Sequence, residues 1–126
     1  IKSILNNEQP IIRSDGTYVR DYFYVEDAVD AFLALAKALD KRQLWGEAFN
    51  FSPENPIAVI EVVNKILKIS NSKLKSKILA EATNEIKKQY LDCSKAHKML
   101  GWKAKTNLGD GLRKTFNWYK EFFRQN

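Results

Sequence analysis

The chain has 126 residues, of which 44% are apolar and 29% are charged, and its formal net charge is +6. This length allows one domain with a hydrophobic core, and the composition excludes a disordered chain. The single cysteine, Cys93, excludes an internal disulfide and fits a reducing compartment. The longest apolar runs fall far short of the roughly 20 residues that span a bilayer, so we expect a cytoplasmic protein without membrane contact.

The positive charge is concentrated in the middle of the chain. Residues 65–105 contain 11 basic and 3 acidic residues, whereas residues 1–64 contain 6 basic and 10 acidic residues. Such a block can mark a nucleic-acid surface, but the lysines in "KLKSK", "KKQY" and "SKAHK" lack interleaved glycine or arginine. A solvated face is therefore the favoured interpretation, with nucleic-acid binding as the alternative.

The first 24 residues predict short, mostly extended segments. Residues 1–9 have helical spacing without a capping residue, and residues 10–13 form a short β-type run. Ser14-Asp15-Gly16 signals a turn, after which residues 18–24 alternate as in a strand. This pattern predicts a small hairpin or an equivalent pair of extended segments.

The next segments alternate between helix and strand. From Val25 to Leu39 the apolar residues fall on one helical face, with Glu26 and Asp27 in the first turn, where the helix dipole favours acids. Residues 46–52 predict a short strand, and residues 57–69 resume helical spacing. A strand between two amphipathic helices is typical of an α/β unit.

The C-terminal third predicts one more strand at residues 77–79, an extended pair at 90–91, and two helices. Asp92 is placed to cap a helix that runs to Leu100 and ends at Gly101. Asn107 caps the last helix, whose aromatic stripe is predicted to lie in the core. The stripe comprises Leu108, Leu112, Phe116, Tyr119 and Phe122 or Phe123.

No catalytic constellation is present in the sequence. There is no glycine-rich phosphate loop after a strand, no partnered nucleophile and no metal-ligand cluster. His97 lies in a lysine-rich helix and is interpreted as a surface residue, and Cys93 as a small, partly buried side chain without reactivity. We therefore predict no catalytic, cofactor-binding or metal-ligating residue in this chain.

Binding chemistry remains, and Arg20 is the clearest candidate. It lies within the β-prone run "DGTYVRDYFYVED", so its guanidinium emerges near a strand end, where five donors can hold a phosphate or pyrophosphate. The alternative is an ion pair with Asp21, Glu26 or Asp27. The residues alone leave both readings open.

Three runs together resemble a known family: "PIIRSDGTYVRDYFYVEDAVDAFLAL", "GEAFNFS" and "QYLDCSKAHKMLGWKAKTNLGDGLRKTFNWY". In this order they are similar to the C-terminal part of the extended short-chain dehydrogenase/reductases, the NAD-dependent nucleotide-sugar epimerases and dehydratases. Within that family, "IIR" and "NEIKKQYLDCSKA" look most like CDP-glucose 4,6-dehydratases. The run "DGTYVRDYFYV" is also similar to the wider epimerase and dehydratase pattern.

The resemblance implies an α/β fold with short strands and about four helices, forming the substrate-binding lobe of a Rossmann-type enzyme. Residues 1–126 would be a single substrate-binding domain, with the N-terminal NAD-binding domain and the catalytic Tyr-x-x-x-Lys absent from this chain. NAD is thus implied for the full enzyme and not bound here. The implied partner is a nucleotide sugar such as CDP-glucose, and exposed apolar surface would favour homo-oligomers.

The resemblance also assigns roles to individual residues. Arg20 matches the family arginine that contacts the diphosphate of the nucleotide sugar. Asn50 matches a position beside the substrate, although an amide that satisfies a turn would look the same, and Arg13 would approach the nucleotide unless it is a plain surface residue. Asn84 and Glu85 fall in a loop near the substrate. A second phosphate-binding arginine of some relatives aligns near Ala82, so Lys87 or Lys88 replaces it or that contact is missing.

The function that the resemblance implies is nucleotide-sugar binding in a 4,6-dehydratase. This enzyme would be a lyase similar to CDP-glucose 4,6-dehydratase, with a role in polysaccharide biosynthesis. The chain is not expected to be catalytically competent alone. The alternatives are a 4-epimerase, a stand-alone binding or regulatory module, and a basic nucleic-acid-binding protein.

Overall fold

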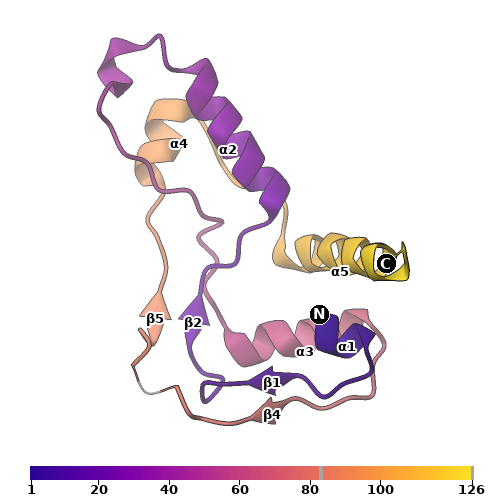
Figure 1. Cartoon of the computed structure of the whole chain (residues 1–126). Helices are drawn as coiled ribbons and strands as arrows, with labels where there is room; N and C mark the ends of the chain where they lie inside the picture. The colour runs from indigo at the N-terminus through magenta and orange to yellow at the C-terminus, as the bar shows by residue number, and fades with distance from the viewer. Residues whose placement is uncertain (83, 126) are drawn as a thin grey trace.

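The computed structural model describes residues 1–82 and 84–125, and over these residues the chain is a small α/β structure (Figure 1). The helices are α1 (Lys2–Leu5), α2 (Val25–Lys37), α3 (Val59–Ile69), α4 (Ser94–Leu100) and α5 (Leu108–Gln125), with a 3₁₀ turn at Arg42–Leu44. The strands are β1 (Ile11–Ile12), β2 (Val19–Arg20), β3 (Ile57–Ala58), β4 (Lys77–Ile78) and β5 (Lys88–Gln89). The predicted α/β fold class with short strands is confirmed, and the described residues form five helices where about four were expected.

The strands form two small sheets, so of the two predicted arrangements the pair of extended segments is observed and the hairpin is not. β1 pairs in parallel with β4, whereas β2 lies between antiparallel β3 and parallel β5. Gly16, at φ 85°, turns the chain between β1 and β2. The Gly16 and Tyr18 carbonyls then accept hydrogen bonds from the N–H groups of Ile60 (3.0 Å) and Val59 (2.9 Å). The backbone after the turn is thus paired with the segment that enters α3, so it cannot fold back on β1.

Three other predicted boundaries also differ from the structure. Residues 46–52 lie within the described part of the chain and form no strand. Their Phe49 and Phe51 pack, partly buried, against the cluster that contains Trp102. Helix α3 begins at Val59, two residues later than predicted, because Ile57 and Ala58 pair with β2. The last strand is Lys88–Gln89, immediately before the predicted pair 90–91, since its pairing with β2 ends there. The predicted strand at 77–79 is confirmed as β4.

Two hydrophobic clusters hold the elements together. The first joins α1, α3 and α5 through Ile4, Leu67 and Phe116, which brings the two chain termini side by side (Figure 1). The second joins α2 to α4 through Ala31, Ala96 and Trp102. Phe23 and Phe51 meet the Trp102 ring edge-on, at centroid distances of 5.7 and 5.0 Å. The second cluster therefore ties the segment after β2 and the segment before β3 to the end of α4.

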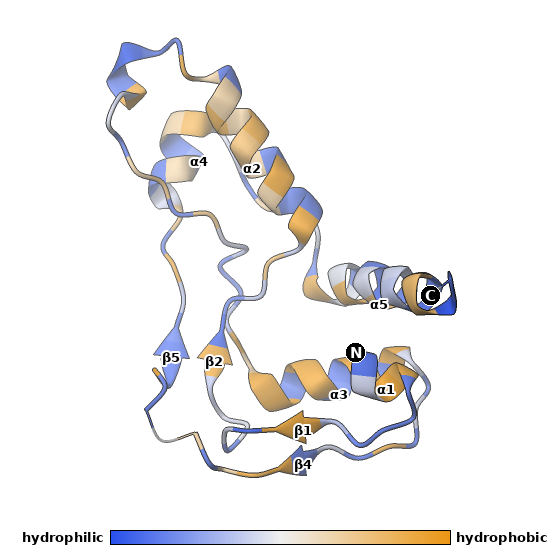
Figure 2. Cartoon of the chain, viewed as in Figure 1, coloured by the Kyte–Doolittle hydropathy of each residue, from blue (hydrophilic) through white to orange (hydrophobic). Residues whose placement is uncertain are grey.

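Large apolar side chains of α2 and α5 are exposed. Figure 2 shows the apolar residues of α2 in orange along its ribbon. On α2 the small Ala31 is buried, while Phe32 is 72% exposed, and Val25, Val29 and Leu33 are also exposed. On α5 only Phe116 of the predicted aromatic stripe is buried, and Tyr119, Phe122 and Phe123 are exposed. The prediction that the stripe is core is thus largely wrong, because α3 and α1 cover only one side of α5 near Phe116.

Helix ends follow the sequence signals closely. Asn107 Oδ1 accepts a hydrogen bond from the Asp110 N–H (3.0 Å), and its amide donates to the Asp110 carboxylate (2.7 Å). Asp92 Oδ1 accepts from the N–H of Ser94 (2.8 Å), and the bonds from the Ser94 side chain and backbone lower the pKa of Asp92. Gly101 ends α4 at φ 66°. Over residues 1–82 and 84–125, no helix combines the length and apolar character that a membrane crossing requires.

Candidate functional site

Arg20 lies in the middle strand of the three-stranded sheet, with its side chain 26% exposed. Its Nη1 donates a hydrogen bond to the Val19 carbonyl (2.8 Å), and its guanidinium carbon lies 6.0 Å from the centre of the Tyr18 ring. Its Nη2 faces Glu85 Oε2 at 3.7 Å. One arm of the guanidinium is therefore anchored to the protein, and the other meets a single carboxylate.

The acids that the sequence offered as alternative partners of Arg20 are engaged elsewhere. Asp21 accepts from the Ser52 hydroxyl and from the Asn55 N–H (3.1 Å). Glu26 pairs with Lys114 (3.0 Å), and buried Asp27 accepts two backbone N–H groups at residues 105 and 106. The observed partner is Glu85, itself one of the predicted site residues.

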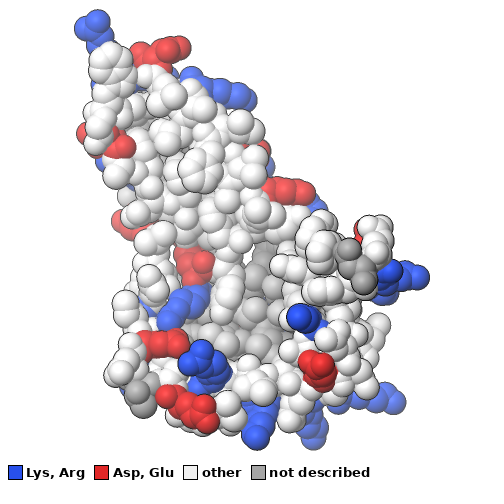
Figure 3. Space-filling view, viewed as in Figure 1, with Lys and Arg blue, Asp and Glu red and all other residues white. Residues whose placement is uncertain are grey.

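The loop that carries Asn84 and Glu85 is held against β1 and β2 at both of its ends. The Arg13 carbonyl accepts from the N–H groups of Glu81 (2.8 Å) and Ala82 (3.2 Å), and the Tyr18 hydroxyl donates to the Ala82 carbonyl (2.8 Å). At the other end the Val19 N–H donates to the Lys87 carbonyl (2.8 Å). Figure 3 shows basic and acidic side chains gathered over β2 and β5. Arg13, Arg20, Asn84 and Glu85 thus come from three neighbouring segments: the end of β1, β2, and the loop between β4 and β5.

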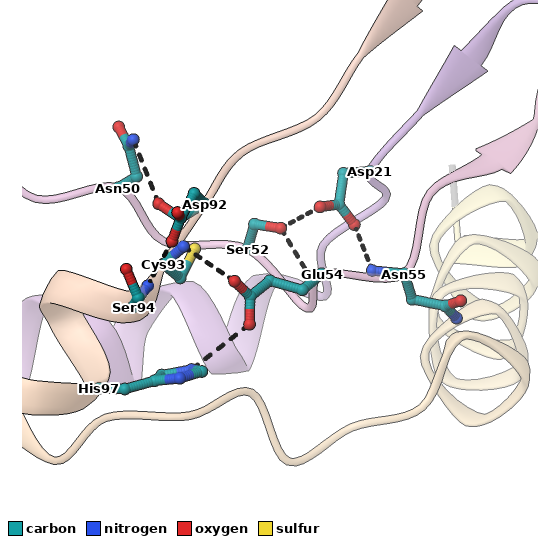
Figure 4. A network of polar contacts seen from close by, with 9 residues as sticks. All are labelled: Asp21, Asn50, Ser52, Glu54, Asn55, Asp92, Cys93, Ser94 and His97. Carbon is teal, nitrogen blue, oxygen red and sulfur yellow. Dashed lines mark hydrogen bonds and ion pairs between the residues drawn. The ribbon is translucent and has the colours of Figure 1, made fainter.

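Asn50 lies apart from this group. Its amide donates to the Asp92 carbonyl (3.4 Å) at the start of α4, at the opposite end of the contact network from Asp21 (Figure 4). This matches the alternative considered from the sequence, an amide that satisfies a turn. Among the contacts of the described residues, Asn50 is joined to the start of α4 and not to Arg20.

A polar network that sequence reasoning missed connects the end of β2 to α4 (Figure 4). The buried Ser52 hydroxyl donates to Asp21 and accepts from the Glu54 N–H (2.9 Å). Glu54 in turn accepts from the Cys93 N–H (2.9 Å) and lies 3.8 Å from His97 Nε2. Partners 31 and 39 positions apart leave no local signal, so no motif could have indicated this network.

Cys93 is more deeply buried than the sequence predicted, whereas His97 lies partly exposed as expected. The Cys93 side chain is fully buried, and desolvation by burial raises the pKa of its thiol, with the nearby Glu54 carboxylate adding to the shift. A buried thiol with a raised pKa is a poor nucleophile. His97 is partly exposed on α4, with its Nε2 3.8 Å from Glu54 Oε2.

The larger cavities lie away from Arg20. One of about 590 Å³ separates the start of α2 from α5 and is lined by Phe23, Tyr24, Val25, Trp118 and their neighbours. Within the described part of the chain, no group of three or more His, Cys, Asp or Glu side chains is arranged to hold a metal ion.

Comparison with known proteins identifies the class to which this fold and surface belong. The sequence model described as GDP-mannose 4,6 dehydratase matches residues 1–115. The UDP-glucuronate 4-epimerase of Thermodesulfobacterium geofontis is 32% identical over 116 residues, which are 90% of this chain and 34% of that protein. A trifunctional enzyme of Arabidopsis thaliana, named for UDP-glucose 4,6-dehydratase, 3,5-epimerase and reductase activities, is 35% identical over 87% of this chain and 16% of its own length.

Solved structures agree with the sequence comparison. The UDP-glucuronic acid 4-epimerase of Bacillus cereus, solved with UDP-glucuronic acid and NAD, superposes with a TM-score of 0.87 at 26% identity. The match covers 96% of this chain and 38% of that one, and the chain corresponds to the C-terminal part of such epimerases. The chain belongs to the GDP-mannose 4,6 dehydratase family of nucleotide-sugar epimerases and dehydratases. It spans 34% of the length of the Thermodesulfobacterium geofontis epimerase and 16% of that of the trifunctional Arabidopsis thaliana enzyme.

The described residues do not fit the NAD that the family implies. A dinucleotide cradle needs glycines that let the backbone approach a pyrophosphate between a strand and a helix. Here a Cβ on Gly16 would meet the Ile60 side chain at 3.2 Å, and one on Gly111 would meet Tyr24 at 3.2 Å. Gly16 and Gly111 therefore serve internal packing and do not form a dinucleotide cradle.

Proposed function

We propose that this chain is a single nucleotide-sugar-binding domain of an NAD-dependent enzyme and that Arg20 binds the diphosphate. The observation that carries the proposal is the half-anchored guanidinium, which leaves Nη2 facing outward toward one exposed carboxylate. A planar guanidinium forms two parallel charged hydrogen bonds with phosphate oxygens, and anchoring one arm reduces the entropy lost on binding. A surface with this chemistry is suited to a phosphate ester.

The neighbouring segments supply the rest of the proposed site. Arg13 is exposed just after β1, and Asn84 lies beside Glu85 in the loop between β4 and β5. We assign the nucleotide to the side of Arg13 and the diphosphate to Arg20. Lys87 and Lys88 are exposed on the same segment and add positive charge there. Asn50 has the weakest support, since it contacts the start of α4 instead.

The reaction of the whole enzyme is proposed as 4,6-dehydration, with CDP-glucose as the substrate. The dehydratase family match supports the reaction class, and the runs "IIR" and "NEIKKQYLDCSKA" support the CDP-glucose assignment. A 4-epimerase is the second candidate, because both the 32%-identical relative from Thermodesulfobacterium geofontis and the superposed Bacillus cereus structure are 4-epimerases. In either case the NAD-binding portion completes the site, and this chain contributes binding and specificity.

Titration of the chain with UDP-glucose and CDP-glucose, followed by amide chemical shifts, tests the proposal. Arg20→Ala should weaken binding of the preferred ligand about 10- to 100-fold, the range expected for losing a hydrogen bond to a charged group. Arg42→Ala is the matched control, because Arg42 is exposed beside Trp45 in the 3₁₀ turn. Equal affinities for Arg20→Ala and the unchanged chain would refute the diphosphate assignment.

Two further measurements separate the remaining alternatives. A nucleic-acid-binding protein would shift RNA or DNA at low salt and lose affinity steeply as salt is added. The absence of such a shift would remove that alternative. Sequencing the gene upstream separates a stand-alone module from an enzyme domain. A glycine-rich loop and a Tyr-x-x-x-Lys motif encoded there would indicate the enzyme.

A further inference from the structure

We infer that Glu85 occupies the phosphate position beside Arg20 when no ligand is bound, and that an incoming diphosphate must displace it. The inference rests on the proposed function and adds a property of the same site. The Glu85 carboxylate is an anion of the protein itself that competes with the diphosphate and lowers the affinity of the site for it. It follows from the geometry of the ion pair, from the loop that carries it and from the exposure of its two partners.

The ion pair is loose and asymmetric. Its Nη2 to Oε2 distance of 3.7 Å exceeds the 2.7–2.9 Å typical of charged hydrogen bonds. Arg20 is anchored by the Val19 carbonyl and is 26% exposed, whereas the Glu85 side chain is 53% exposed. The arginine therefore keeps its position if the pair breaks, and the glutamate is the partner that can leave.

The loop keeps Glu85 close to Arg20 even when the pair is broken. Ala82 is held by the Tyr18 hydroxyl, and Lys87 is held by the Val19 N–H, so the backbone is fixed on both sides of Glu85. Both anchoring residues belong to the same short segment as Arg20. Rotation of one side chain into solvent is then enough to open the position, and the reverse rotation closes it.

A phosphate has two advantages over this carboxylate. It can present two oxygens to the guanidinium at hydrogen-bond distance, and a diphosphate carries more negative charge than one carboxylate. Exposed ion pairs are weak, so the competition lowers the affinity for a diphosphate by a small factor of about two to five. Every ligand that must displace Glu85 loses affinity by this same factor. The advantage of a diphosphate over a monoanion comes from its own contacts with Arg20.

Titrations with UDP and with inorganic pyrophosphate test the inference. Glu85→Gln should bind both probes about two to five times more tightly than the unchanged chain. Glu81→Gln is the matched control, since Glu81 is exposed on the same segment and its replacement changes the net charge equally. In an Arg20→Ala background the gain from Glu85→Gln should vanish. Amide spectra of each variant establish that it is folded.

Each outcome of this experiment is informative. Equal gains for Glu85→Gln and Glu81→Gln would attribute the effect to overall charge and overturn the inference. Weaker binding by Glu85→Gln would mean that the carboxylate contacts the ligand, which also overturns it. If Arg20→Ala leaves UDP binding unchanged, the proposed function itself fails. If Arg20→Ala weakens binding while Glu85→Gln has no effect, the proposed function stands and only the competing role of Glu85 is lost.

Discussion

Replacing Asp27 with alanine should destabilise the chain more than any change to its exposed acids. Asp27 is 4% exposed in the first turn of α2. Its two oxygens accept the backbone N–H groups of Lys105 (3.2 Å) and Thr106 (3.0 Å), which lie 78 and 79 positions further along the chain. One carboxylate thereby holds the start of α2 to the segment that leads into α5.

The size of the effect follows from these two bonds. A hydrogen bond to a charged group contributes about 1.5–3 kcal/mol, and its loss leaves a partly buried N–H without a partner. The acid also interacts favourably with the N-terminal end of α2, by about 0.3–1 kcal/mol. Since the bond from Lys105 is long, we expect a total loss of about 3–5 kcal/mol, a large part of the 5–15 kcal/mol typical of a domain.

Urea unfolding followed by circular dichroism measures this loss. Asp30→Ala is the matched control on the same helix: Asp30 pairs with the exposed Lys105 ammonium at 2.8 Å, so its removal should cost less than about 1 kcal/mol. Asp27→Asn should fall between the two, since its amide oxygen can still accept one bond. Equal losses for Asp27→Ala and Asp30→Ala would refute the idea that Asp27 joins the two segments.

Two other predictions concern Cys93 and the exposed face of α2. Because burial raises the pKa of the Cys93 thiol above 9.0, native chain should react with a thiol reagent at pH 8 far more slowly than chain in urea; similar rates would contradict its burial. By the same linkage the fold should lose stability as pH rises above 9.0, where the unfolded thiol ionises first, and a Cys93→Ser variant should lack that part of the pH dependence. Phe32 is 72% exposed among other apolar residues of α2, so sedimentation velocity should detect self-association of the chain, and Phe32→Lys should weaken it without lowering the melting temperature. An unchanged association constant in that variant would show that α2 is not the contact.

Local signals predicted several helix ends and the strand that carries Arg20. Asn107, Asp92 and Gly101 act at the helix ends where the sequence placed them, because capping depends on a few neighbouring residues. The strand position of Arg20 was also predicted, because alternation and the turn before it are local features. The ion-pair partner of Arg20 was not predicted. Spacing offered the neighbouring acids Asp21, Glu26 and Asp27, whereas the observed partner is the distant Glu85.

Pairing between distant segments is what the sequence could not predict. β1 pairs with β4 and β2 pairs with β5, so the expected hairpin never forms. The Tyr18 hydroxyl donates to the carbonyl of Ala82, which lies 64 positions further along the chain. No pattern in either segment indicates that the two are in contact. Likewise, helical spacing showed that α2 has one apolar face, but it could not show that the small residue Ala31 would be the buried one.

By itself the sequence determined an α/β chain with capped helices and a strand that carries one arginine between aromatic residues. The tertiary structure decided which carboxylate meets that arginine, which loop crosses it, and which apolar surfaces remain uncovered. The physical reason is that capping and periodicity depend on neighbours within one or two turns, whereas pairing and burial depend on where the whole chain brings distant segments together.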